Sequence, residues 1–139
     1  MTLQLQATAE EVMRAVETLQ ALGRQGGVGV RDLFGLALAL EECGSNIVNH
    51  AFQRDARQQV QVALEHAADA FIIELRDRGP AFDPTAASGR GAAASDDDPP
   101  GGWGLQLARR YLDEIRYTRE AGENVLRLMK RLGPAAGGR

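Results

Sequence analysis

The stretch Leu40-Glu-Glu-Cys-Gly-Ser-Asn-Ile-Val-Asn-His-Ala-Phe52 combines an apolar stripe with a polar ridge on one helix. The apolar residues recur at helical spacing and are Leu33, Leu36, Leu40, Cys43, Ile47 and Ala51. Asp32 suits the N-cap position. The pattern therefore predicts an amphipathic helix from Asp32 to about Phe52.

Four polar residues lie beside this stripe at positions i, i+4, i+7 and i+8, and they are Glu42, Asn46, Asn49 and His50. At these spacings they form one ridge at the edge of the core. Each polar group left unpaired there costs on the order of 1 to 3 kcal/mol. A bound ion or ligand would supply the missing partners, and the alternative interpretation is a solvated shoulder of the helix.

The segments on either side of this helix predict the remaining elements. Residues 2–8 alternate apolar and polar side chains, which predicts a short strand. Thr8 and Glu11 have the spacing of a capping box, so a helix is expected from Ala9 to about Gly23.

Downstream of the central helix, residues 58–65 and 69–77 alternate again and predict an antiparallel hairpin. Residues 103–113 have the apolar spacing of a third helix, and residues 114–119 and 124–132 predict two further paired strands.

Together these elements predict a single domain over residues 1–132, followed by a mobile tail at 133–139. The expected fold class is α/β in its α+β form, a two-layer sandwich. In this sandwich a mostly antiparallel mixed sheet is covered on one face by three helices, around residues 9–23, 32–52 and 103–113.

The second predicted hairpin strand ends on a carboxylate that faces inward. Phe71, Ile73 and Leu75 share one parity of the strand, and Asp77 continues it. Gly79 follows two residues later and allows a close approach of the backbone. Asp77 is therefore a candidate binding residue, although Asp-x-Gly alone is more often only a turn that ends a strand.

A long segment without periodicity follows this strand. Residues 80–102 are rich in glycine, proline and aspartate, and so long an insert is usually a functional lid or a disordered segment; we assign a lid to residues 83–102. Directly before the third predicted helix stands Gly101-Gly-Trp-Gly-Leu105. Glycines at a helix start expose backbone N–H groups that can meet a phosphate, and the alternative is a flexible joint.

Composition excludes several classes of function. The 139 residues carry a formal net charge of −3 and a pI near 5.4, so the chain lacks the basic footprint of a nonspecific nucleic-acid or anionic-membrane binder. Its one cysteine, Cys43, excludes an internal disulfide and a cysteine-cluster zinc site, and its place on the apolar stripe suits a buried hydrophobe. No stretch approaches the roughly 18 apolar residues of a membrane span, and no signal peptide is visible, so we expect a cytoplasmic protein.

The order of the motifs is more specific than any one of them. A helix with Glu-x-x-x-Asn-x-x-x-His is followed by Asp-x-Gly at a strand end, a glycine-rich lid, and Gly-x-Gly-Leu at a helix start. This order resembles the N box and the two glycine boxes of the GHKL ATP-binding superfamily. Within it, the chain most resembles the small anti-sigma-factor serine/threonine-protein kinases of the RsbW type, over nearly its whole length.

The resemblance implies ATP and Mg²⁺ as cofactors and a role for each motif. Glu42 would be the catalytic general base, Asn46 the magnesium ligand, and Asp77 the acceptor of a hydrogen bond from the adenine amino group. The other cofactor-binding positions that it implies are Asn49, His50, Gly79, Phe82, Gly102, Trp103, Gly104 and Leu105. Phosphoryl transfer needs positioning and charge neutralisation more than covalent help, which suits such a division of roles.

The resemblance also implies partners. The expected function is ATP-dependent phosphorylation of a serine or threonine on a STAS-type anti-sigma antagonist, coupled with sequestration of a sigma factor or comparable regulator. A homodimer is expected, with residues 2–23 in the protein-binding face.

The alternative function is a nonenzymatic, nucleotide-gated protein-binding module. Two departures from the family pattern keep it open. Gly44 lies inside the predicted helix, where glycine costs roughly 1 kcal/mol relative to alanine. The lid lacks lysine and contains three consecutive aspartates, Asp96, Asp97 and Asp98.

Overall fold

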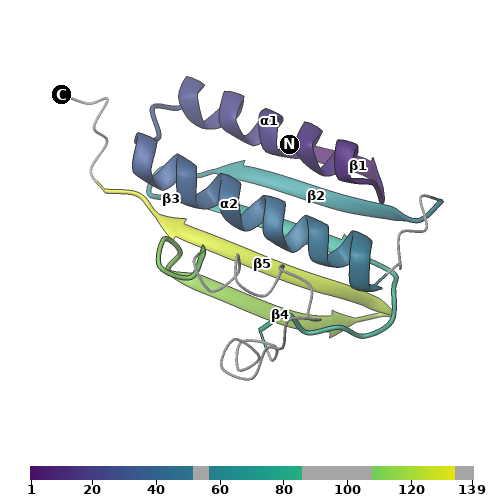
Figure 1. Ribbon diagram of the computed structural model, residues 1–139. Helices are drawn as coiled ribbons and strands as arrows, with labels where there is room; N and C mark the ends of the chain where they lie inside the picture. The colour runs from purple at the N-terminus through teal and green to yellow at the C-terminus, as the bar shows by residue number, and fades with distance from the viewer. Residues whose placement is uncertain (52–56, 86–107, 134–139) are drawn as a thin grey trace, which may run out of the picture.

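The computed structural model describes residues 1–51, 57–85 and 108–133 (Figure 1). In chain order the elements are β1 (Thr2–Gln6), α1 (Ala9–Gln25), α2 (Val30–Asn46), the π-helix η1 (Ile47–Ala51), β2 (Gln59–His66), β3 (Ala70–Asp77), β4 (Glu114–Glu120) and β5 (Glu123–Arg131). The predicted lid beyond residue 85 and the predicted tail beyond residue 133 lie outside these ranges. None of the helices in the described ranges is both long enough and apolar enough to cross a membrane.

The five strands form one sheet in the order β1-β2-β3-β5-β4, and α1 and α2 lie side by side on one of its faces (Figure 1). This arrangement confirms the two-layer α+β sandwich. Every pairing among the described strands is antiparallel, so the prediction of a mixed sheet is wrong. The reason is connectivity: β2–β3 and β4–β5 are hairpins, and β5 runs back along β3.

The core lies between this sheet and the two helices. Every second residue of β3 is buried, namely Phe71, Ile73, Leu75 and Asp77. The helices contribute Leu19, Leu36 and Leu40, none more than 1% exposed. Each such burial stabilises the fold by roughly 1.5 to 3 kcal/mol, and together these contacts hold α2 over the sheet.

Thr8 caps the first helix as the sequence predicts, whereas Glu11 bonds two residues before the N-cap and does not close the predicted capping box. The Oγ1 of Thr8 accepts a hydrogen bond from the Glu11 N–H at 3.2 Å, and Oε1 of Glu11 accepts one from the Gln6 N–H at 3.3 Å. These bonds satisfy backbone donors around the start of α1. The helix ends at Gln25, two residues beyond its predicted end.

The second helix differs from the prediction at both ends. Gly29 is its N-cap, and Asp32 lies in the first turn, where a negative charge suits the positive end of the helix dipole. The α-helix ends at Asn46, and Ile47–Ala51 form η1 instead of continuing it. Phe52, the predicted end, lies outside the described residues.

The third predicted helix falls mostly outside the described residues. Within the described part, Ala108 is helical and residues 109–111 form a turn, so this helix ends earlier than residue 113. The Tyr111 N–H donates to the Ala108 carbonyl at 2.9 Å, a tight i→i−3 bond that closes the segment before β4 begins.

Gly44 has its explanation in the packing of the two helices. A β-carbon at this position would lie 2.9 Å from Cγ1 of Val12 on α1. Glycine therefore lets α1 and α2 approach closely at the buried side of α2, and this contact offsets its low helix propensity.

Candidate functional site

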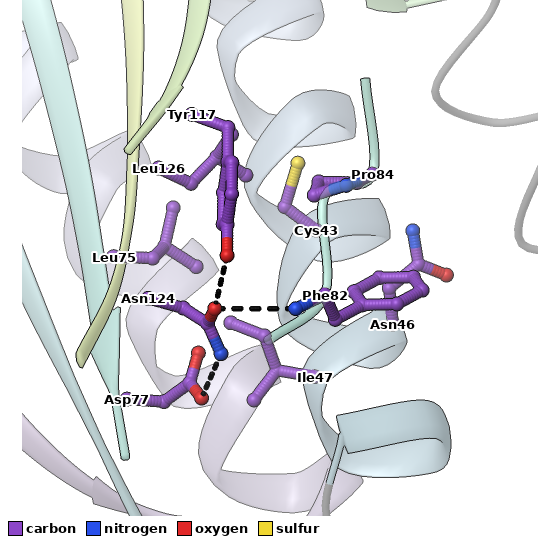
Figure 2. Close-up of a pocket in the computed structure, with 10 residues that line it drawn as sticks. All are labelled: Cys43, Asn46, Ile47, Leu75, Asp77, Phe82, Pro84, Tyr117, Asn124 and Leu126. Atoms are coloured by element: carbon purple, nitrogen blue, oxygen red, sulfur yellow. Dashed lines mark hydrogen bonds between the residues drawn. The ribbon is translucent and has the colours of Figure 1, made fainter. Parts of the chain in front are cut away.

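A pocket opens beside the C-terminal end of α2 and the adjacent ends of β3 and β5 (Figure 2). The side chains that line it come from Cys43, Asn46, Ile47, Leu75, Asp77, Phe82, Pro84, Tyr117, Asn124 and Leu126. The space between their atoms, with the open mouth included, is about 290 Å³. Mainly apolar walls with a few convergent polar groups are typical of small-molecule sites.

Asp77 is the inward-facing carboxylate of this pocket, as its strand parity predicts. It is 4% exposed, and its Oδ1 accepts hydrogen bonds from the Gly79 N–H at 2.9 Å and from Nδ2 of Asn124 at 3.0 Å. Both bonds that Asp77 accepts within the described residues end on Oδ1. Oδ2 is therefore left as the acceptor for a ligand.

Asn124 is the residue of the pocket that the sequence reasoning missed. It is buried on β5 directly opposite Asp77 of β3. Its carboxamide forms hydrogen bonds with Asp77, with the Phe82 N–H and with the Tyr117 hydroxyl (Figure 2). A signal for it was present, because Asn124 shares the inward parity of Leu126 and Leu128. A carboxamide at an inward position of a strand requires partners in the same way as Asp77 does.

Two residues of the predicted ridge remain near the pocket. Asn46 lines it and is 7% exposed. Glu42 lies one turn earlier on α2, half-buried and outside the pocket lining. Desolvation, with a smaller contribution from the charge of Glu41, raises the pKa of Glu42 to about 7.

Past Asn46 the predicted ridge enters η1. Asn49 lies in η1 and is exposed, and His50 is described only as part of the η1 backbone. The exposure of Asn49 agrees at this position with the alternative interpretation, a solvated shoulder of the helix, and the π-helix changes the angular spacing of the residues that follow Asn46.

The remaining predicted site residues divide into two groups. Phe82 lines the pocket, and Gly79 is buried at the turn after β3, where its N–H binds Asp77. The others, Gly102, Trp103, Gly104 and Leu105, lie outside the described residues.

Cys43 forms part of the pocket wall as a buried hydrophobe. It is 1% exposed, and burial raises the pKa of its thiol to about 12, with a smaller contribution from Glu42. Since the thiolate is the nucleophilic form, this cysteine is unreactive at neutral pH.

Comparisons with known proteins agree with this architecture. A family model described as the histidine kinase-like ATPase domain matches residues 5–130. The serine/threonine-protein kinase BtrW of Bordetella bronchiseptica is 33% identical over 134 residues, which cover 96% of this chain and 94% of that protein. The serine-protein kinase RsbW of Staphylococcus epidermidis is 26% identical over 88% of this chain and 81% of its own length.

A solved structure shows the same fold. The crystal structure of the RsbU and RsbW domains of a Mycobacterium tuberculosis protein superposes with a TM-score of 0.68 at 22% sequence identity, covering 95% of this chain and 31% of that one. Because the family model matches most of the chain and a relative aligns over 96% of it, this chain belongs to the histidine kinase-like ATPase domain family.

Proposed function

We propose that this chain is an ATP-dependent protein kinase that phosphorylates a serine or threonine of a STAS-type anti-sigma antagonist and sequesters a sigma factor or comparable regulator. Family membership supports this proposal, and so do the two relatives that are named as serine or serine/threonine kinases. The observation that carries the proposal is Asp77, which has one oxygen held inside the protein and the other left for a ligand in a mostly apolar pocket.

The pocket would hold the adenine of ATP. Asp77 would accept the hydrogen bond of the 6-amino group on Oδ2, while Phe82 and the aliphatic side chains of the wall would contact the ring. Gly79 lets the backbone after β3 turn under the base and supplies the N–H that fixes Oδ1. The resemblance assigns the phosphates to Gly102 and Gly104, with Trp103 and Leu105 beside them.

The described residues fit a magnesium ion that arrives with the triphosphate. The amide of Asn46 borders the pocket and makes no hydrogen bond to a described residue. Within the described ranges no three His, Cys, Asp or Glu side chains gather to hold an ion by themselves. Magnesium typically keeps several waters and takes few protein ligands, and when bound it neutralises charge on the phosphates. Asn46 would supply an amide oxygen, and Asn49 and His50 would lie near it along η1.

Glu42 would act as the general base. Its carboxylate would accept the proton of the attacking serine or threonine hydroxyl while the hydroxyl oxygen bonds to the γ-phosphorus and the bond to ADP breaks. A pKa of about 7 suits this role, because a base is most effective when its pKa lies near the working pH.

A homodimer in the cytoplasm is the form in which we expect the protein to act, with residues 2–23 in its protein-binding face. Light scattering tests the oligomeric state. A monomer at micromolar concentration, with and without ATP, would contradict the dimer.

The experiment that tests the function is incubation of the purified protein with magnesium ATP and candidate antagonist domains. Phosphate transfer to serine or threonine, located by mass spectrometry, is the expected result. Stable binding without transfer would favour the alternative, a nucleotide-gated binding module. The close packing of Gly44 against Val12 removes one of the two reasons for that alternative, since this glycine has a structural cause.

A further inference from the structure

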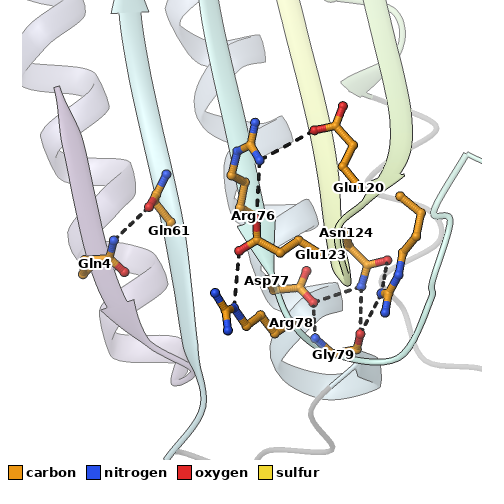
Figure 3. A network of polar contacts seen from close by, with 10 residues as sticks. Gln4, Gln61, Arg76, Asp77, Arg78, Gly79, Glu120, Glu123 and Asn124 are labelled. Carbon is orange, nitrogen blue, oxygen red and sulfur yellow. Dashed lines mark hydrogen bonds and ion pairs between the residues drawn. The ribbon is translucent and has the colours of Figure 1, made fainter.

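We infer that Asn124 is a positioning residue that determines which nucleobase the pocket accepts, because it holds the carboxylate of Asp77 in one orientation. The inference rests on the proposed nucleotide function. Asn124 is 4% exposed and pairs in register with Asp77, so its side chain and that of Asp77 enter the same layer of the fold (Figure 3).

Three donors converge on one atom of Asn124. Its Oδ1 accepts hydrogen bonds from the Phe82 N–H at 3.2 Å, from Nη1 of Arg119 at 3.1 Å and from the Tyr117 hydroxyl. A flipped carboxamide would bring the NH₂ group against these three donors. The orientation of the amide is therefore fixed by β4 and by the turn after β3.

The nitrogen of Asn124 is consequently directed at acceptors. Nδ2 donates to Oδ1 of Asp77 at 3.0 Å and to the Pro80 carbonyl at 2.9 Å, and the Gly79 carbonyl lies at 3.5 Å. The Gly79 N–H reaches the same Oδ1 of Asp77 at 2.9 Å. With two donors on Oδ1, the carboxylate of Asp77 does not turn, and Oδ2 stays in place as an acceptor.

A fixed acceptor discriminates among nucleobases. It accepts a hydrogen bond from a purine that carries an amino group. A purine without this donor leaves Oδ2 of Asp77 unpaired, which is costly in a buried site. Asn124 would thus act through Asp77. A purely structural Asn124 would stabilise the turn at residues 79–82 without affecting the preference between two purines.

The test compares two substitutions of the same shape. Asn124→Val and Asn124→Thr are both β-branched and suit a strand, but only threonine retains a hydrogen-bond donor. Calorimetry measures the Kd of each folded variant for magnesium ATP and for purine riboside triphosphate, which lacks the 6-amino group. We expect the preference for ATP to fall at least about tenfold in Asn124→Val and by less in Asn124→Thr.

Glu123→Gln is the matched control. Glu123 precedes Asn124 on β5, and its carboxylate instead pairs with Arg76 at 3.5 Å and Arg78 at 3.6 Å (Figure 3). Its removal should leave the preference unchanged, and a fall as large as that of Asn124→Val would overturn the inference.

The remaining outcomes are also decisive. An unchanged preference in Asn124→Val, or an equal loss in the valine and threonine variants, overturns the inference. If Asn124→Val does not fold, Tyr117→Phe replaces it in the test, because this substitution removes one of the three donors to Oδ1 of Asn124. A lower preference for ATP in Tyr117→Phe than in the parent supports the inference. A preference equal to that of the parent overturns it. A parent that binds neither triphosphate overturns the proposed function itself, whereas a parent that prefers ATP with unaffected variants overturns only the role of Asn124.

Discussion

Glu42 combines partial burial with a neighbouring carboxylate, and these raise its pKa to about 7. A general base acts in its deprotonated form, so phosphate transfer should increase as the pH rises through about 7 and then level off. Glu42→Gln should lower transfer by roughly 100-fold or more and abolish this pH step. Initial rates of transfer across the neutral pH range measure both effects, with ATP affinity retained.

Glu41→Gln is the control for this prediction. Glu41 is exposed and raises the pKa of Glu42 through its charge. Its neutralisation should keep transfer and move the pH step to lower pH. Equal rates and equal pH profiles in Glu42→Gln and the parent would exclude Glu42 as the base.

The same pKa predicts an effect on stability. The folded pKa of about 7 lies above the ordinary glutamate pKa of 4.5, so the folded state binds this proton more tightly than the unfolded state does. Ionisation of Glu42 therefore lowers stability as the pH rises from the unfolded toward the folded pKa. Glu42→Gln should raise the thermal midpoint above neutral pH and have little effect in acid, as measured by thermal unfolding at both pH values. An equal shift at both would contradict the assignment.

Asp77 supplies the other prediction at the scale of single residues. Asp77→Asn replaces an acceptor with an amide that can present its NH₂ group to the base, so affinity for ATP should fall roughly 10-fold to 100-fold. Calorimetry on the folded variant measures this loss. Asp69→Asn, an exposed carboxylate just before the other end of β3, is the control and should bind like the parent. Unchanged affinity in Asp77→Asn would remove Asp77 from the binding site.

At the scale of elements, the contact between α2 and the segment before β4 depends on Gly35. A β-carbon there would lie 2.2 Å from Cβ of Tyr111, whose ring packs edge-on against Phe34 at 5.6 Å and under the guanidinium of Arg31 at 5.1 Å. Gly35→Ala forces Tyr111 away and should lower the free energy of unfolding by about 1 to 3 kcal/mol. Chemical denaturation measures this.

Gly133→Ala is the control for that prediction, because no atom of the described residues beyond its chain neighbours lies within 4 Å of a β-carbon there. It should change stability by no more than about 0.5 kcal/mol. If Gly35→Ala is as stable as Gly133→Ala, Tyr111 does not hold this segment on α2.

At the scale of the whole molecule, a ligand that binds only the folded state must stabilise it. Magnesium ATP at about 100 times its Kd should add about 2.7 kcal/mol and raise the thermal midpoint by several degrees. Asp77→Asn at the same nucleotide concentration should show a smaller rise. Thermal unfolding with and without nucleotide measures both, and an unshifted parent would contradict nucleotide binding.

Local patterns in the sequence were enough to predict the elements and the direction in which key side chains face. Periods of two and of about 3.6 are local, so they identified α1, α2 and the strands, and the parity of β3 placed Asp77 inside. The positions of Glu42 and Asn46 one turn apart on α2 followed from the same periodicity.

The way in which these residues are combined depends on contacts that form when the chain folds. Asn124 meets Asp77 across 47 positions of sequence, because β5 lies next to β3 in the sheet, on the side opposite β2. The raised pKa of Glu42 and the contact of Gly44 with Val12 likewise depend on packing, and the change to η1 after Asn46 depends on the fold around it. Local periodicity carries no information on which strands pair or on how deeply a group is desolvated, since both are set by contacts between segments distant in sequence.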